Sequence, residues 1–296
     1  MHGTAQMIAA LAALATMLLS GSPALAGRAI GATRIYVAEQ ADTLVDIAVA
    51  AGVGFMELKA ANPDVDVWSP GAGTRVFLPG LHLLPDAPEK GIVINLADMR
   101  LYLFRSGSVM SWPIGIGREG RNTPVGTTRA TRKVRNPSWY PPESIRQEKP
   151  WLPGRVEPGS DNPLGSRAIY LGWPRYLIHG TNKPYGVGRR ISSGCIRMYP
   201  QDVEALFELV QPGLSVRVVD QPVKLGWIDD TLFVEVHPTE AQQEQLETNG
   251  SFTAEIPDDL APRVREATKG RATTVDWNAV RTAGIQRLGY PVPVTR

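Results

Sequence analysis

Residues 175–198 read RYLIHGTNKPYGVGRRISSGCIRM and contain the only cysteine of the chain, Cys195, with a histidine, His179, upstream of it. The apolar residues 176–178 predict a short buried strand that ends at His179. Residues 181–188 combine glycine, proline and asparagine and predict a loop. Because a loop can bring two strand ends together, this arrangement allows an imidazole to reach a thiol, as nucleophilic catalysis by a thiol requires.

Residues 191–198 predict a second extended segment, in which Gly194 lets the backbone turn tightly before the thiol. A helix is expected over residues 201–210, because Pro200 suits a first helical position and acidic residues follow it. Together these signals indicate two extended segments followed by a helix.

A free cysteine is most often a small buried hydrophobic residue, and a histidine at a strand end is often structural. The neighbours of Cys195 argue for a reactive thiol, because they are polar or carry positive charge, which favours the thiolate. They are Ser192, Ser193, Gly194, Arg189, Arg190 and Arg197. We therefore interpret Cys195 as a nucleophile and His179 as its base.

Two segments of this stretch, His179-Gly180-Thr181-Asn182 and Ser192-Ser193-Gly194-Cys195-Ile196-Arg197, resemble the signature of the L,D-transpeptidases of bacterial cell walls, with a YkuD-type, ErfK/YbiS-like catalytic domain. The resemblance implies that Cys195 attacks a peptide carbonyl and that His179 is its base and acid. It also implies that the Gly180 carbonyl orients the imidazole and that the backbone at Gly194 helps to form an oxyanion hole. Residues expected to contact substrate are Arg197, Arg190, Thr181, Asn182, Ser193 and Trp139.

The amino-terminal residues predict export. An apolar run over residues 7–19 is too short to span a bilayer comfortably, and Ala24-Leu25-Ala26 forms an A-x-A cleavage pattern. We expect residues 1–26 to be a signal peptide and the mature chain to be periplasmic without stable membrane insertion; an uncleaved anchor is the alternative, since no Lys or Arg precedes the run. An exported chain with one cysteine cannot form an internal disulfide, which favours a functional thiol.

The 296-residue chain has an ordinary globular composition, with 43% hydrophobic and 20% charged residues and a net charge of +2. This charge gives no field that would steer the chain to nucleic acid. A lone cysteine with scattered histidines lacks any metal-ligand spacing, so neither a metal nor another cofactor is expected.

Residues 34–80 predict a small α+β unit with the order strand, helix, helix, strand. The helices are expected over residues 44–51 and 55–61. This order, with short DTL and ANP motifs, resembles a LysM domain and implies glycan binding; a spacer that binds nothing is the alternative. Residues 81–90, which contain prolines and acids, are expected to be a linker.

Residues 91–220 predict a mainly β catalytic domain, a sandwich or a small barrel, with one helix after Cys195. Within it, residues 115–142 contain a glycine-rich turn, a TP.G element and an NP.W stretch that also match the transpeptidase pattern. A long polar excursion follows Pro142 and ends at Gly165, and we expect it to form a lid or a wall of the site. Residues 221–237 are expected to form a hairpin packed on this domain. Residues 238–296 are an appendage of unknown role with three short helices.

The resemblance implies a transferase that takes a peptidoglycan tetrapeptide stem onto the cysteine as a thioester and passes it to an amine. The acceptor is another stem or a lysine of an outer-membrane lipoprotein. The family is also acylated by carbapenems at the cysteine. Two alternatives stay open: a hydrolase on the same fold, an L,D-carboxypeptidase, and a non-catalytic peptidoglycan-binding protein.

Overall fold

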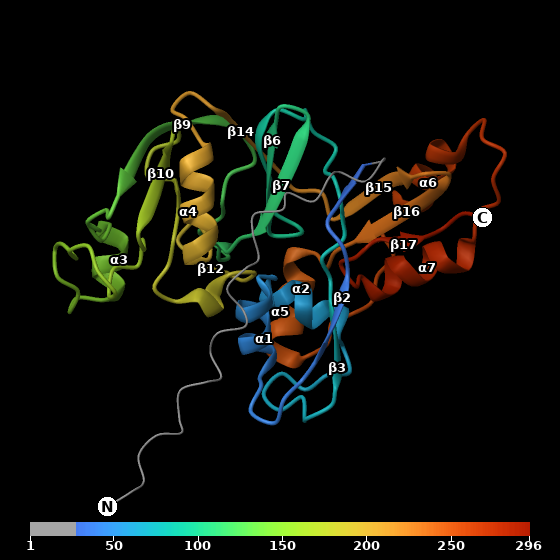
Figure 1. Cartoon of the computed structure of the whole chain (residues 1–296), viewed down its shortest axis with the longest axis horizontal. Coiled ribbons are helices and arrows are strands. Elements are labelled where there is room, and N and C mark those ends of the chain that lie inside the picture. The colour runs from blue at the N-terminus through green and yellow to red at the C-terminus, as the bar shows by residue number, and fades with distance from the viewer. Residues whose placement is uncertain (1–27) are drawn as a thin grey trace, which may run out of the picture.

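The structure is a computed structural model that describes residues 28–296 (Figure 1), so the expected signal peptide, 1–26, lies outside the described residues. Within the described part of the chain, no helix has both the length and the apolar composition needed to cross a bilayer.

An eight-stranded sheet organises the catalytic region, and residues 91–220 are mainly β as predicted. In spatial order its strands are β13 (Ile196–Arg197), β11 (Leu177–His179), β10 (Arg167–Leu171), β9 (Gly126–Arg135), β14 (Ser215–Val219), β5 (Gly91–Asn95), β6 (Arg100–Arg105) and β7 (Ser108–Pro113). All five residues of β5 are buried, because this strand lies inside the sheet and is covered on both faces. Helix α4 (Pro200–Leu209) packs against β10, as Figure 1 shows, and begins at the expected proline.

The chain after β6 and the expected extended segment over residues 191–198 are each divided in the structure. Strand β7 ends at Pro113, and a separate strand, β8 (Ile116–Gly117), pairs in parallel with β12 (Arg190–Ser192). Residues 191–198 divide in the same way into β12 and β13. The break is at Gly194, whose φ of 102° no extended strand can contain. The excursion after β9 carries helix α3 (Glu143–Glu148), which buries no residue.

The amino-terminal unit has the predicted order: β2 (Arg34–Val37), α1 (Leu44–Ala51), α2 (Phe55–Ala61) and β3 (Arg75–Leu78), with β2 antiparallel to β3. It is docked firmly on the catalytic region. The first backbone N–H groups of α2, which no intrahelical carbonyl can satisfy, donate to the carbonyls of Val187 and Gly188 in the loop after η1 (Pro184–Gly186).

The first half of the expected linker, residues 81–90, is packed into the protein: residues 82–85 are buried, whereas Asp86 and residues 88–90 are exposed. The segment contains β4 (His82–Leu83), which pairs with β1 (Ala29–Ile30). The His82 and Leu83 side chains are buried, and the Leu83 N–H donates to Glu235 at 2.6 Å. The prolines and acids of this segment suggested an exposed connection. In the structure, the polar groups of His82 and Leu83 bind Glu57 and Glu235 of the neighbouring units.

The hairpin over residues 221–237 has most of its core in common with the carboxy-terminal appendage rather than with the catalytic sheet. Its strands β15 (Val223–Ile228) and β16 (Thr231–Val236) join β17 (Val292–Pro293) in a three-stranded sheet. Apolar side chains of α6 (Leu260–Thr268) and α7 (Trp277–Gln286) fill a common core with these strands. The three helices predicted in the appendage are present, and this sheet with α6 and α7 forms one unit.

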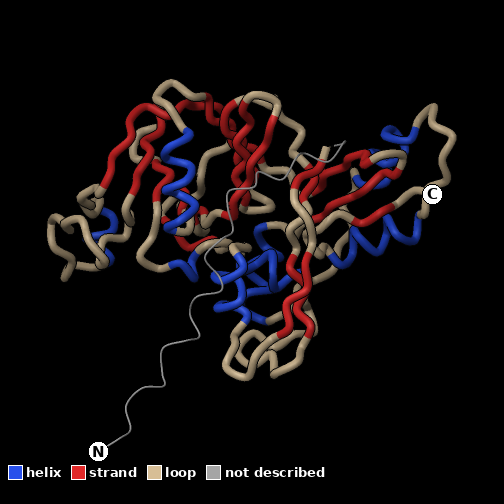
Figure 2. Tube along the Cα trace, in the orientation of Figure 1, coloured by secondary structure: helices blue, strands red, loops and turns tan. Residues whose placement is uncertain are grey.

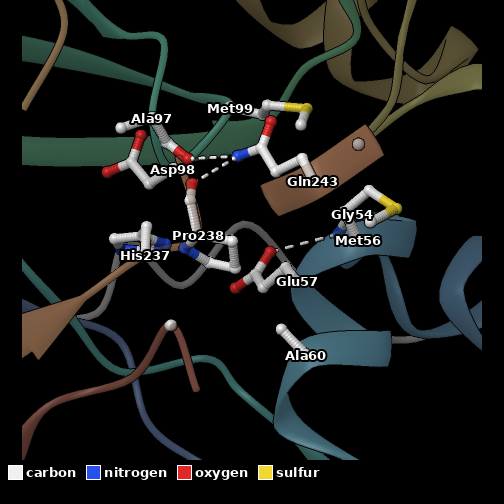
Figure 3. Close-up of a pocket in the computed structure, with 12 residues that line it drawn as sticks. Gly54, Met56, Glu57, Ala60, Ala97, Asp98, Met99, His237, Pro238 and Gln243 are labelled. Atoms are coloured by element: carbon white, nitrogen blue, oxygen red, sulfur yellow. Dashed lines mark hydrogen bonds between the residues drawn. The ribbon is translucent and has the colours of Figure 1, made fainter. Parts of the chain in front are cut away.

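Helix α5 (Glu240–Asn249) leaves that unit and lies beside α2 in the middle of the molecule (Figures 1 and 2). The Gln243 amide donates to the carbonyls of Ala97 and Pro238, at the wall of a small cavity between the three units (Figure 3). The appendage therefore reaches the catalytic region directly.

A buried ionic cluster joins the same three units. Lys224 Nζ lies 2.7 Å from Asp98 and 2.8 Å from Glu235, and all three side chains are almost fully buried. Next to them, Arg100 pairs with Glu57 of α2 at 3.0 Å. Burial acts to raise the pKa of Glu57, but Arg100 and His82 outweigh it and lower that pKa to about 2.

Candidate active site

The register of two neighbouring strands places the cysteine and the histidine on one face of the sheet. Strand β11 runs parallel to β13 with Ile178 opposite Ile196, and both isoleucines are fully buried. Because side chains alternate along a strand, His179 and the residues on either side of Ile196 project to the other face of the sheet. Those residues are Cys195 and Arg197.

His179 is held as a neutral base. Its ring is buried, and Nδ1 lies 2.6 Å from the Gly180 carbonyl oxygen, so Nδ1 donates its proton there and Nε2 is left as an acceptor. Burial, together with the positive charge of Arg197, lowers the pKa of His179 to about 4 against the opposing effect of the Gly180 hydrogen bond. The imidazole is therefore unprotonated at neutral pH.

Cys195 is half-buried and rests as a thiol. Its Sγ donates to the Arg175 carbonyl at 3.4 Å. Burial raises the pKa of Cys195 above its ordinary value, although the Leu177 N–H and the Arg197 charge act in the opposite direction. The thiol therefore needs a base to remove its proton, and His179 projects from the adjacent strand.

The structure corrects the idea that several arginines activate the thiol. Arg189 lies over the Phe55 ring at 3.7 Å and pairs with Glu247 of α5. Arg190 donates to Gln243 at 2.8 Å and pairs with Glu240, so this predicted substrate contact is engaged by the appendage instead. Of the three arginines, only Arg197 acts on the pKa of the thiol.

Gly194 occupies a position that only glycine fits. Its φ is 102°, and an added Cβ would lie 2.9 Å from Tyr176 Cε1. Its N–H donates to Ser192 Oγ at 3.1 Å, and that hydroxyl donates to the Cys195 carbonyl at 2.6 Å. Since the Gly194 N–H is engaged, an oxyanion at this turn would have to be bound by another donor.

Thr123 fastens the glycine-rich turn to the nucleophile turn. Its Oγ1 accepts from the Gly117 N–H at 3.2 Å and donates to the Gly194 carbonyl at 2.9 Å, and the side chain is buried. Sequence reasoning did not select Thr123, although the TP.G element that contains it was recognised. The threonine hydroxyl in this element is the feature from which Thr123 could have been predicted.

Arg175 was missed completely. Its φ is 71°, a left-handed conformation that is strained for a residue with a side chain, and its carbonyl accepts the Cys195 thiol. Arginine gives no sequence signal for such a backbone, so this contact is visible only in the structure.

The four other residues that were predicted to contact substrate have different surroundings. Thr181 is buried and accepts from the Lys183 N–H at 3.0 Å. Asn182 donates to the Asp161 carbonyl at 3.1 Å, which ties the loop after His179 to the excursion over residues 143–165. Ser193 is exposed beside Cys195. Trp139 is half-buried and pairs through its backbone with Val156 inside the excursion.

Three side chains of the kinds that ligate metal ions lie close together at the junction of the three units. Asp98, Glu235 and His237 offer atoms within 4.8 Å of one another. The Lys224 ammonium lies between the two carboxylates and supplies positive charge there. The residues fit an internal ion pair better than a metal ion, and no catalytic residue belongs to the group.

Comparison with known proteins agrees with this arrangement. Residues 89–219 match the family model "YkuD: L,D-transpeptidase catalytic domain". The chain is 38% identical over 253 residues to the Escherichia coli protein named "Probable L,D-transpeptidase ErfK/SrfK", covering 82% of this chain and 79% of that protein. It is 37% identical over 280 residues to the Escherichia coli "Probable L,D-transpeptidase YbiS", covering 90% and 88%. With "Probable L,D-transpeptidase YcfS" of the same species the identity is 42%, over 69% and 67% of the two chains.

The mainly β region that presents Cys195 and His179 on one sheet face lies within the match to an L,D-transpeptidase catalytic domain. The chain belongs to the L,D-transpeptidase family.

Proposed function

We propose that this chain is a periplasmic enzyme that transfers a peptidoglycan tetrapeptide stem to an amine through a thioester on Cys195. The observation that carries the proposal is the buried, neutral His179, whose Nδ1 is bound by Gly180 and whose ring projects to the same sheet face as the thiol. The membership of the chain in the L,D-transpeptidase family supports peptidoglycan as the substrate. The periplasmic location rests on the signal peptide expected over residues 1–26.

In the first half-reaction, Cys195 Sγ attacks the carbonyl that joins the third residue of the stem to the terminal D-Ala. The thiol proton passes to His179 Nε2, and the Cys195 N–H donates to the oxyanion, since the Gly194 N–H is already bound. The C–N bond then breaks, and the D-Ala amine takes the proton from His179. The product is a thioester and free D-Ala.

In the second half-reaction, an amine attacks the thioester carbonyl and gives a proton to His179. The C–S bond breaks, and the thiolate recovers that proton. The amine belongs to a second stem or to a lipoprotein lysine. Water in the same place would make the enzyme an L,D-carboxypeptidase.

Product analysis separates these outcomes. The mature chain is incubated with a tetrapeptide stem, with and without an amine acceptor, beside Cys195→Ala and His179→Gln. Transfer predicts release of D-Ala together with a new amide that depends on the acceptor. Release of D-Ala with tripeptide as the only product in both arms would identify a hydrolase. No release by the unmodified chain would contradict the proposal.

We also propose that the unit over residues 34–80 binds glycan. The first N–H groups of α2 are occupied by the catalytic region, which leaves the opposite end of the unit for a ligand. Trp68, 73% exposed, lies there in the loop between α2 and β3. Pull-down of the chain on purified peptidoglycan, compared with Trp68→Ala, tests this role; equal retention of the two would contradict it.

A further inference from the structure

Two arginines of the glycine-rich turn converge on one carboxylate of the excursion that flanks the site. Arg118 Nη2 donates to both carboxylate oxygens of Glu148 at 3.0 Å, and Arg121 pairs with the same group. Arg121 also donates to Ser144 Oγ at 3.0 Å. Ser144 and Glu148 both belong to α3, so these contacts attach that helix to the turn.

The turn that carries the arginines is part of the wall of the active site. The Arg118 N–H donates to the Ser192 carbonyl at 3.0 Å. An added Cβ on Gly194 would lie 3.4 Å from the Arg121 carbonyl oxygen, so the turn touches the residue before the nucleophile. A group bound by the arginines is therefore next to the peptide that Cys195 attacks.

The present partner of the arginines is easy to displace. The side chains of Arg118, Arg121 and Glu148 are 46%, 24% and 41% exposed. Exposed ion pairs of this kind contribute little to stability, because water screens them. Helix α3 buries no residue, so the core does not fix Glu148 in this position.

Resting on the proposed function, we propose that Arg118 and Arg121 form the subsite for a free carboxylate of the stem peptide, with Glu148 occupying it until the peptide binds. Two guanidinium groups around one carboxylate form a site of the type that binds acidic peptides. Displacement of Glu148 breaks its ion pairs with both arginines and leaves only the Ser144 contact between α3 and the turn, so that the excursion can move aside for the substrate.

Equilibrium binding tests this subsite without turnover. In the Cys195→Ala chain, calorimetry compares a tetrapeptide stem as the free acid with two analogues, one amidated at the C-terminal carboxyl and one at a side-chain carboxyl. Glu148→Gln should tighten binding of the free acid about two- to fivefold by removing the competing carboxylate. Arg121→Gln and Arg118→Gln should each weaken it about tenfold.

One amidated analogue should bind equally to the parent and to the Glu148, Arg118 and Arg121 variants. The carboxylate that is blocked in that analogue is the one that the arginines hold. Glu208→Gln is the matched control, because it frees Arg135 from a similar exposed pair outside the turn. Equal effects on the free acid and on both amides, no effect on any, or no binding of any peptide would overturn the subsite. The proposed function is judged separately by acylation of Cys195, which does not depend on these outcomes.

Discussion

His179 Nδ1 and the Gly180 carbonyl oxygen lie 2.6 Å apart, so a backbone carbonyl fixes the tautomer of the His179 imidazole. A carboxylate in this position would raise the pKa of the histidine by its negative charge. The neutral carbonyl does this only weakly, and burial with Arg197 lowers the pKa of His179 to about 4. The imidazole is therefore unprotonated, and available as a base, throughout the pH range near neutrality.

This low pKa predicts a specific acid sensitivity of the fold. The unfolded histidine has a pKa of about 6.5, so the unfolded state binds the extra proton between pH 6.5 and 4 and stability falls as the pH falls through that window. The loss is on the order of 3 kcal/mol. Urea unfolding at pH 7 and pH 4 should show that His179→Gln escapes this part of the decline. Parallel curves for the two proteins would contradict the low pKa.

The thiol should titrate late. Burial raises the pKa of Cys195 above its ordinary value, so its alkylation by iodoacetamide should still be accelerating at the pH where free cysteine is already half ionised, about 8.5. Arg197→Gln should move the inflection further upward, because it removes a positive charge that favours the thiolate. A rate that levels off below pH 7 would instead indicate a preformed thiolate.

Thr123 should act as a positioning residue. Thr123→Val leaves the Gly117 N–H and the Gly194 carbonyl without their partner, which should slow acylation of Cys195 about ten- to a hundredfold. Thr123→Ser keeps the hydroxyl and should restore most of the rate. If serine and valine give equal rates while both proteins melt like the parent, the hydroxyl has no role in holding the turn.

Lys224 should be essential for stability rather than for chemistry. Lys224→Met leaves the Asp98 and Glu235 carboxylates buried beside each other, and we expect a loss of about 3–5 kcal/mol in urea unfolding. Lys269→Met removes an exposed partner of Glu266 and should change stability by less than about 0.5 kcal/mol. Similar losses in the two variants would show that the buried cluster is not a stabilising junction.

Local signals in the sequence predicted local structure well. Helices α1 and α2 begin and end at the predicted residues, because capping groups and the 3.6-residue apolar period act within each segment. The strand that ends at His179 was also predicted, from the apolar residues 176–178. The extended segment predicted around Cys195 is present only as two short strands on either side of Gly194.

Long-range partners decided what sequence reasoning missed. The segment 81–90 is fixed by Glu235 and Glu57, and the hairpin over residues 221–237 by helices far along the chain. Arg189 and Arg190 looked like activators of the thiol, but their partners on α5 lie more than fifty positions away. No local pattern encodes such pairings.

The most direct test is the intact mass of the mature chain after incubation with a carbapenem, beside Cys195→Ala. The account predicts one covalent adduct per chain on the unmodified protein and none on the variant, with slow or absent acylation of His179→Gln. A folded protein with a reduced thiol and no adduct, or an adduct that persists in Cys195→Ala, would contradict the assignment of Cys195 as the acyl-accepting nucleophile.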